Sequence, residues 1–265
     1  MSLILAIDVG NSRVKFGLFE SPLATEGSVS PHLPSPLHTV SVPVGGSFPW
    51  ADLSQWAGGH SPSAVIAGPN PAGIDRVRGE WGLLDCAVPR VVSDSAELGI
   101  EIRVDSPERV GIDRLLNAFA ANVLRPREQM AIVVSSGTAT TIDVVSVDGA
   151  FEGGAILPGF DLAARSLHEH TALLPLIDPS ELSATKVPPL GKNTSSAIRS
   201  GLLYGQVGAV RELIARIAGG RDPFVIVTGG GGALLAHSLG DGTILEPELA
   251  LRGLARLAVR GCCRS

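Results

Sequence analysis

The sequence predicts an α/β protein of two similar domains, and two observations carry that prediction. A short polar turn containing glycine joins two apolar, strand-like runs at residues 4–19, and a second segment of the same build occupies residues 131–145. Strand-length apolar runs also alternate with helix-like segments along the chain. The two hairpins indicate domains at residues 1–125 and 126–265, which face each other across a cleft and bind a polyphosphate between them.

The first turn has the composition of an anion-binding loop. Gly10 lets the backbone come close to a ligand, and Asn11 and Ser12 add short hydrogen-bond donors. Asp8 ends the preceding buried strand and is placed to face a metal ion held by that anion. An ordinary hairpin turn remains the alternative, because Asp and Asn beside Gly are common in hairpins.

The second turn repeats this build with hydroxyl side chains. Superposing Gly10 on Gly137 sets Asp8 opposite Ser135 and Asn11 opposite Thr138. The recurrence strengthens the phosphate-binding interpretation of both turns, because any single short motif is weak.

The rest of the first half predicts a mixed sheet with helices. Val44 ends an alternating run that is typical of an edge strand, where Pro43 is tolerated. In chain order the predicted elements are this edge strand at 38–44, a short helix at 52–57, a buried strand at 63–69, a helix reaching Trp81, a strand at 89–93 and a helix at 115–124.

The segment Gly111-Ile112-Asp113-Arg114 stands at the entry of that last helix. A carboxylate there can accept a proton from a substrate hydroxyl, and an arginine can bind a substrate carboxylate in bidentate fashion. The alternative is structural, with Asp113 stabilising the helix dipole and Arg114 solvated.

The second half carries three further features. Residues 153–159 predict a glycine-rich turn, and either Asn193 or Thr194 is a suitable N-cap for a long helix through Ile217. A strand at 224–228 runs into four glycines, which allow close backbone approach to a ligand or form a plain crossover turn. Helices are also predicted at 162–171 and 246–259.

Composition excludes several classes of protein. A hydrophobic fraction of 45% with 18% charged residues fits a well-buried globular protein, yet no apolar run approaches the roughly 20 residues of a membrane span. The net charge of -5 and the lack of a basic stripe argue against nucleic acid as a partner. The N-terminus has no basic leader, so a signal peptide is not expected. The cysteines form no metal-ligand or disulfide pattern, which favours a reducing cytoplasm; they are Cys86, Cys262 and Cys263.

Five motifs in order resemble those of the type III pantothenate kinases, within the acetate and sugar kinase, actin and heat-shock chaperone ATPase superfamily. They occupy residues 8–15, 111–114, 137–141, 153–159 and 191–194. The resemblance covers nearly the whole chain and implies two ribonuclease-H-like (actin-like ATPase) domains around a nucleotide cleft. It also implies ATP-dependent phosphorylation of pantothenate, the first step of coenzyme A biosynthesis.

The resemblance further implies a role for each matching residue. Asp113 corresponds to the general base, and Thr194 to a residue that reaches pantothenate from the second subunit of a homodimer. Other matching positions for pantothenate are Gly111, Ile112, Arg114 and Val104. For ATP they are Asp8, Val9, Gly10, Asn11, Ser12, Arg13, Val14, Lys15, Thr138, Gly229 and Gly230, with Asp8 also facing Mg²⁺.

Two positions depart from the family pattern. Val104 stands where the family has a tyrosine that contacts pantothenate, and Ser135 where it has an aspartate that binds an activating K⁺ or NH₄⁺. These departures put substrate affinity and cation dependence in doubt. They leave two alternatives, a nucleotide-binding regulatory or accessory protein of the same fold with little turnover, and a kinase for another small hydroxy acid.

Overall fold

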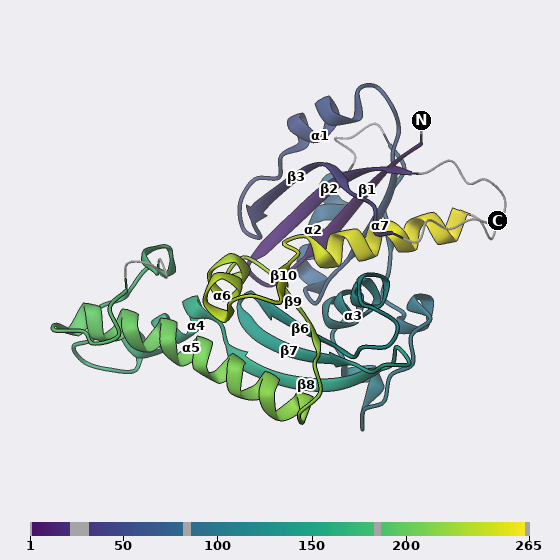
Figure 1. Ribbon diagram of the computed structural model, residues 1–265. Coiled ribbons are helices and arrows are strands. Elements are labelled where there is room, and N and C mark those ends of the chain that lie inside the picture. Colours follow the sequence, from purple (N-terminus) through teal and green to yellow (C-terminus); the bar gives the residue numbers. More distant parts are fainter. Residues whose placement is uncertain (1, 22–31, 82–85, 183–186, 263–265) are drawn as a thin grey trace. The chain divides into compact units, whose positions relative to one another are not determined.

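A computed structural model describes residues 2–21, 32–81, 86–182 and 187–262 (Figure 1). The chain forms two compact units. The first contains Met1–Glu101, Asp105–Leu124 and Glu248–Ser265, and the second contains Ile102–Val104 and Arg125–Pro247. The sequence places residues 126–265 in one domain, whereas the structure groups the C-terminal segment with the first unit because helix α7 (Leu249–Cys262) packs against β1 there.

The first unit is built on a five-stranded sheet in the order β3-β2-β1-β4-β5. Strand β1 pairs antiparallel with β2, as the hairpin pattern predicts, and parallel with β4. Strand β3 lies at an edge, where Pro43 costs no ladder hydrogen bond. The strands are β1 (Ser2–Val9), β2 (Arg13–Ser21), β3 (Pro36–Pro43), β4 (Ser63–Ala67) and β5 (Arg90–Val91).

Side chains of β1 alternate between the two faces of this sheet. Leu5 and Ile7 belong to a core shared with Leu53 of α1 and Val77 of α2, whereas Ala6 and Asp8 point to the opposite face. Helix α7 packs against β1 (Figure 1). The helices of this unit are α1 (Trp50–Ala57), α2 (Pro71–Glu80), the short 3-10 turns η2 (Ser95–Leu98) and η3 (Pro107–Arg109), α3 (Ile112–Leu124) and α7.

The second unit repeats this plan, with a five-stranded sheet in the order β10-β9-β6-β7-β8. Strand β6 pairs antiparallel with β7 and parallel with β9, so β6 and β7 correspond to β1 and β2. The strands are β6 (Ala131–Ser136), β7 (Ala139–Val145), β8 (Phe151–Pro158), β9 (Phe224–Thr228) and β10 (Thr243–Leu245). The matching order confirms that the chain consists of two similar α/β domains.

The turn predicted at residues 153–159 is wrong, since most of this segment is strand β8, paired antiparallel with β7. One of its glycines allows close packing between strands. A Cβ atom on Gly154 would lie 1.9 Å from the carbonyl oxygen of Ile142. Gly154 therefore marks a close approach of two strand backbones, whereas the neighbouring Gly153 adopts a φ of +88°.

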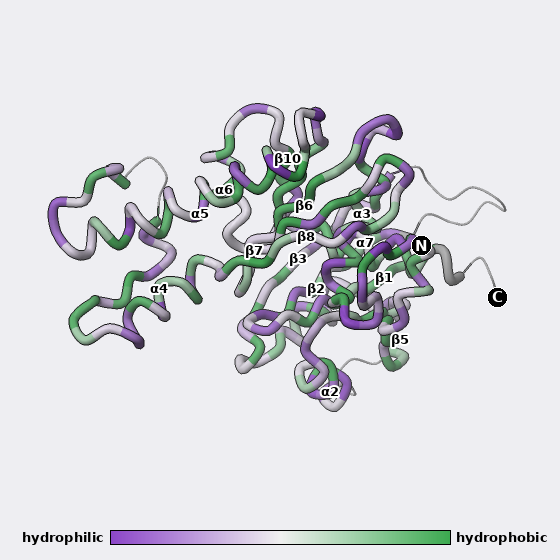
Figure 2. The backbone as a smooth tube through the Cα atoms, turned by 90° about the horizontal axis from the view of Figure 1, so that it is seen from below, coloured by the Kyte–Doolittle hydropathy of each residue, from purple (hydrophilic) through white to green (hydrophobic). Residues whose placement is uncertain are grey.

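The helices of the second unit cover a core formed by the apolar residues of β6, β7 and β9. Hydrophobic and hydrophilic stretches alternate along α4 in Figure 2, as expected of a helix with one buried face. The elements are α4 (Phe160–Glu169), η4 (Pro179–Glu181), α5 (Thr194–Ala218) and α6 (Gly232–Leu239). None of the described helices is both long enough and apolar enough to cross a bilayer.

Candidate active site

The first glycine turn is tied to the neighbouring helix. The N–H of Gly10 donates to the carbonyl of Arg13 at 2.9 Å and closes the turn between β1 and β2. The side chain of Asn70 donates to the carbonyl of Gly10 at 3.3 Å and also accepts from the N–H of Gly73 at 3.0 Å. Asn70 thus caps α2 and holds the turn in place, a role indicated in sequence only by the Asn-Pro helix start.

A glycine follows the neighbouring parallel strand at the same place in each unit. Gly68 has φ of +151°, and its Cβ would lie 2.1 Å from the carbonyl oxygen of Val9. Gly229 has φ of +87°, and its Cβ would lie 2.4 Å from the carbonyl oxygen of Ser136. These glycines let the ends of β4 and β9 pass close to the two turns. The structure leaves open space beside Gly230, so the backbone does not require glycine there for packing.

Asp8 lies in a cluster of charged side chains within the first unit. It is the direct cross-strand partner of Lys15, so both side chains share one face of the sheet. Burial raises the pKa of Asp8 to about 6, the charge of Lys15 lowers it, and the carboxylate of Asp113 raises it. The structure therefore brings Asp113 near two residues that lie about 100 positions earlier in the sequence.

Asp113 lies in the first turn of α3. Burial raises the pKa of its carboxyl, while hydrogen bonds from the backbone N–H groups of Arg114 and of Asp113 itself, and the charge of Arg114, lower it. A Cβ on Gly111 would lie 2.5 Å from Oδ1 of Asp113, so glycine leaves the room that this carboxylate occupies. A partly buried carboxylate with raised basicity suits a general base.

The second glycine turn is one residue shorter than the first. The pair Val9 and Val14 closes the first turn, and the pair Ser136 and Thr140 closes the second. The N–H of Gly137 donates to the carbonyl of Ala139 at 3.0 Å. Ser135 consequently pairs with Thr141 across the strands. In the first unit the corresponding pair is Asp8 and Lys15.

A buried carboxylate lies on the same sheet face as Ser135. Asp143 is fully buried, and its Oδ2 accepts a hydrogen bond from Oγ1 of Thr141 at 2.8 Å. Because Thr141 opposes Ser135 and side chains alternate along a strand, the three oxygen-bearing side chains share one face.

The structure places Val104 and Thr194 in the second unit. The N–H of Arg103 donates to the carbonyl of Phe151 at 2.8 Å, and Cγ1 of Val104 lies 3.3 Å from the position of a Cβ on Gly153. Val104 therefore packs against β8.

Asn193, and not Thr194, caps α5. The N–H of Ser196 donates to Oδ1 of Asn193 at 2.9 Å, and the N–H of Asn193 donates to Oγ of Ser196 at 3.1 Å. This reciprocal pair is a capping box. Thr194 instead lines an open groove of about 590 Å³ beside α4 and α5, with Pro158, Ala163, Ser166, Leu167, Leu174, Ala197, Ile198, Gly201 and Leu202.

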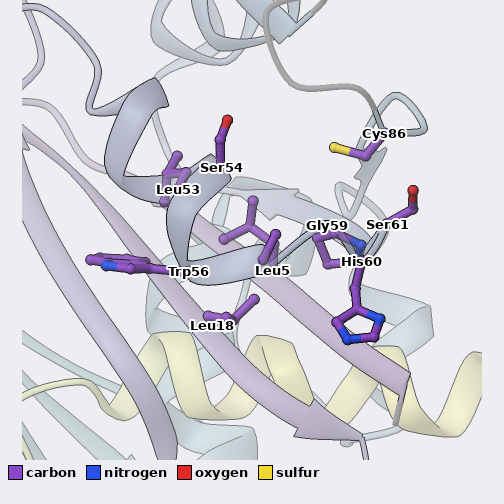
Figure 3. Close-up of a pocket in the computed structure, with 11 residues that line it drawn as sticks. Leu5, Leu18, Leu53, Ser54, Trp56, Gly59, His60, Ser61 and Cys86 are labelled. Carbon is purple, nitrogen blue, oxygen red and sulfur yellow. The ribbon is translucent and has the colours of Figure 1, made fainter.

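The first unit contains a separate cavity of about 200 Å³, shown in Figure 3. Leu5 and Leu18 form its floor, and Trp56, His60 and Cys86 are among the residues around it. Because Leu5 points to the sheet face opposite Asp8, this cavity is not part of the charged cluster.

Comparison with solved structures defines the fold. The structure resembles a putative Baf family transcriptional activator from Campylobacter jejuni, with a TM-score of 0.58 and 18% identity over 97% of this chain and 98% of that one. It also resembles the activator of 2-hydroxyisocaproyl-CoA dehydratase from Clostridium difficile, solved with bound ADPNP, with a TM-score of 0.57 and 12% identity over 99% of this chain and 96% of that one. The fold is that of the actin-like ATPases.

Sequence comparison identifies the family. The family model for type III pantothenate kinase matches residues 4–216. A type III pantothenate kinase from Desulfosudis oleivorans is 35% identical over 95% of this chain and 97% of its own length. One from Dehalococcoides mccartyi is 35% identical over 95% of each chain. The chain belongs to the type III pantothenate kinases, a family of phosphotransferases.

Proposed function

We propose that this protein transfers the γ-phosphoryl group of ATP to the primary hydroxyl of pantothenate, which yields phosphopantothenate and begins coenzyme A biosynthesis. The observation that carries the proposal is the approach of Asp8 to Asp113 within a chain of this family. Phosphoryl transfer needs little covalent help, so positioning and charge neutralisation supply most of the rate enhancement.

The segment at the start of α3 binds the acceptor. Asp113 takes the proton of the substrate hydroxyl, and its raised pKa supports that role. Arg114 pairs with the carboxylate of pantothenate, and the backbone at Gly111 and Ile112 lies against the substrate. Val104 and Thr194 complete the acceptor site.

The two glycine turns bind the triphosphate. The first turn and its flanking strands contribute Asp8 to Lys15, and the second unit contributes Thr138, Gly229 and Gly230. Lys15 offsets the charge of the phosphate oxygens.

The residues present fit a magnesium ion. Mg²⁺ prefers oxygen ligands and is held by one or two carboxylates together with substrate phosphates. Asp8 is a buried carboxylate whose charge interacts with that of Asp113, so Asp8 would hold the ion directly or through water. When bound, Mg²⁺ neutralises negative charge on the transferring phosphoryl group.

A coupled ATP-consumption assay with and without pantothenate tests the proposed reaction. We expect consumption of ATP only when pantothenate is present, with phosphopantothenate detected by mass spectrometry. ATP binding without turnover would instead support an accessory protein of the same fold. Turnover with other hydroxy acids but not with pantothenate would support a kinase of different specificity.

The side chain of Val104 limits affinity for pantothenate in this proposal. We expect Val104→Tyr to lower the KM for pantothenate several-fold, because a regained hydrogen bond contributes about 0.5 to 1.5 kcal/mol. Steady-state kinetics measure the change, and Val147→Tyr, at an exposed position of the same unit, serves as the control. An unchanged or higher KM would mean that the pocket is built around valine.

Ser135 predicts that activity depends little on a monovalent cation. A neutral hydroxyl at Ser135 attracts K⁺ or NH₄⁺ much less than a carboxylate does, so we expect nearly equal activity in Na⁺ and K⁺ buffers. Ser135→Asp should create a response to K⁺. Strong activation of the unmodified protein by K⁺ would contradict this expectation. It would point to a cation site built from backbone carbonyls or from Asp143, which shares the sheet face of Ser135.

The groove beside Thr194 supports a homodimer as the active unit. Leu173 and Leu190 are 90% and 75% exposed in the same unit, and exposed apolar surface favours association. Thr194 then completes the acceptor site of the neighbouring subunit. We expect a mixture of Asp113→Asn and Thr194→Val proteins to recover part of the activity that each lacks alone. A fully active monomer by light scattering would contradict the dimer.

We also propose that the protein is cytoplasmic and has no nucleic-acid or membrane partner. The side chains of Cys262 and Cys263 lie outside the described residues. Cell fractionation tests the location, and recovery in a membrane fraction would contradict it.

A further inference from the structure

Helix α3 contains one polar residue in an otherwise apolar buried stretch. All residues from Leu115 to Ala121 are buried, and only Asn117 among them is polar. Asn117 is 5% exposed, and its Oδ1 has no hydrogen-bond partner among the described residues. A buried polar group without a partner costs about 1 to 3 kcal/mol, so an apolar residue would stabilise the free protein better. Packing alone therefore does not account for Asn117.

The position of Asn117 on the helix relates it to the acceptor segment. At 3.6 residues per turn, Asn117 lies about 40° around the helix axis from Asp113 and about 60° from Arg114. Residues three and four apart on a helix are neighbours, with Cβ atoms about 5 to 6 Å apart. Asn117 thus lies one turn below Asp113 and Arg114, and between them in projection.

The packing contact with α7 involves Leu116 and Ala120 of α3. A Cβ on Gly253 of α7 would lie 2.9 Å from the carbonyl oxygen of Leu116 and 3.2 Å from Cβ of Ala120. Asn117 is about 100° around the axis from Leu116 and about 60° from Ala120, on the side away from Leu116. Its amide belongs to the quadrant of the helix that carries Asp113 and Arg114.

We propose that Asn117 is a substrate-binding residue whose amide hydrogen-bonds the middle of the acceptor, between the hydroxyl at Asp113 and the carboxylate at Arg114. This inference rests on the proposed function. In pantothenate the middle of the molecule carries a secondary hydroxyl and an amide, and both form hydrogen bonds. A side-chain amide offers a donor and an acceptor, and the acceptor Oδ1 of Asn117 meets a partner when substrate is bound.

The first test replaces Asn117 and compares kinetics with stability. We expect Asn117→Leu and Asn117→Ala to raise the KM for pantothenate about 10-fold or more, because a site built for a hydrogen bond loses its partner, and to leave the KM for ATP unchanged. The Tm of Asn117→Leu should equal or exceed that of the unmodified protein. Asn122→Ala is the matched control, since Asn122 lies about 180° around the helix from Asp113.

The second test uses two analogues of pantothenate, one without the secondary hydroxyl and one with an ester in place of the amide. The unmodified protein should bind at least one of them more weakly than pantothenate, and Asn117→Leu should show no further loss for that analogue. If the KM for pantothenate is unchanged in both Asn117 variants, or rises equally in Asn122→Ala, the role assigned to Asn117 is wrong. The proposed function would not be affected by that result. Failure of the unmodified protein to phosphorylate pantothenate would overturn the proposed function as well.

Discussion

Replacing Asp113 with asparagine is expected to lower kcat at least about 100-fold, the contribution typical of a positioned general base. Affinity for ATP should stay nearly unchanged, because the carboxylate faces the acceptor hydroxyl and not the triphosphate. Pre-steady-state kinetics and equilibrium nucleotide binding separate the two effects. The raised pKa of Asp113 also predicts that activity of the unmodified protein falls on acidification at a pH above the ordinary carboxyl range, because the base must be ionised.

Asp161→Asn is the matched control for this experiment. Asp161 also lies in the first turn of a helix, α4, and is more than half exposed beside Arg165. It should change turnover little. Near wild-type turnover in Asp113→Asn would mean that another group takes the proton.

Replacing Asp8 with asparagine is expected to lower turnover and to raise the stability of the ligand-free protein. Turnover should fall at least about 100-fold, because a carboxylate that holds the metal ion contributes several kcal/mol to stabilising charge in the transition state. The ligand-free protein should become more stable at neutral pH, since the folded protein no longer carries a buried charge whose pKa is raised to about 6.

The pH dependence of that gain follows from the direction of the shift. Above pH about 6 the unmodified folded protein holds an ionised Asp8, and the penalty to its stability is on the order of 3 kcal/mol. As the pH falls from about 6 towards the ordinary value of 3.8, Asp8 becomes protonated in the folded state while it is still ionised in the unfolded state. The penalty therefore disappears over this range. Urea denaturation of both proteins at about pH 8 and about pH 4 measures the difference. Equal stability at the higher pH would contradict the assigned burial of Asp8.

Local patterns in the sequence were sufficient to predict the hairpins and most helices. The turn at Gly10 combines a glycine, short polar side chains and flanking apolar runs, and each of these acts over a few residues. Strand β8 could not be predicted in this way, because the packing of Gly154 against Ile142 depends on a partner in another strand. The position of α7 likewise depends on contacts with β1, at the other end of the chain.

The same distinction applies to the candidate site. Asp8 and Asp113 each stand in a motif that predicts phosphate or acceptor chemistry, yet their mutual approach comes from tertiary packing. Asn117 was missed, although its signal is local: a lone polar residue in a buried apolar stretch, four residues after Asp113. The signal becomes visible only once burial is known, because an exposed helix position tolerates asparagine without consequence.

The packing of α7 in the first unit constrains how the protein is made. A ribosome releases the chain from its N-terminus, and domains generally fold as units during synthesis. The second unit has all its residues once Pro247 has emerged, whereas the first unit still lacks α7 at that time. Until α7 arrives, the sheet face that carries Ile4 and Ala6 is without one of its covers. The part of the protein synthesised first is therefore completed last, and chaperone binding during translation should concentrate on β1.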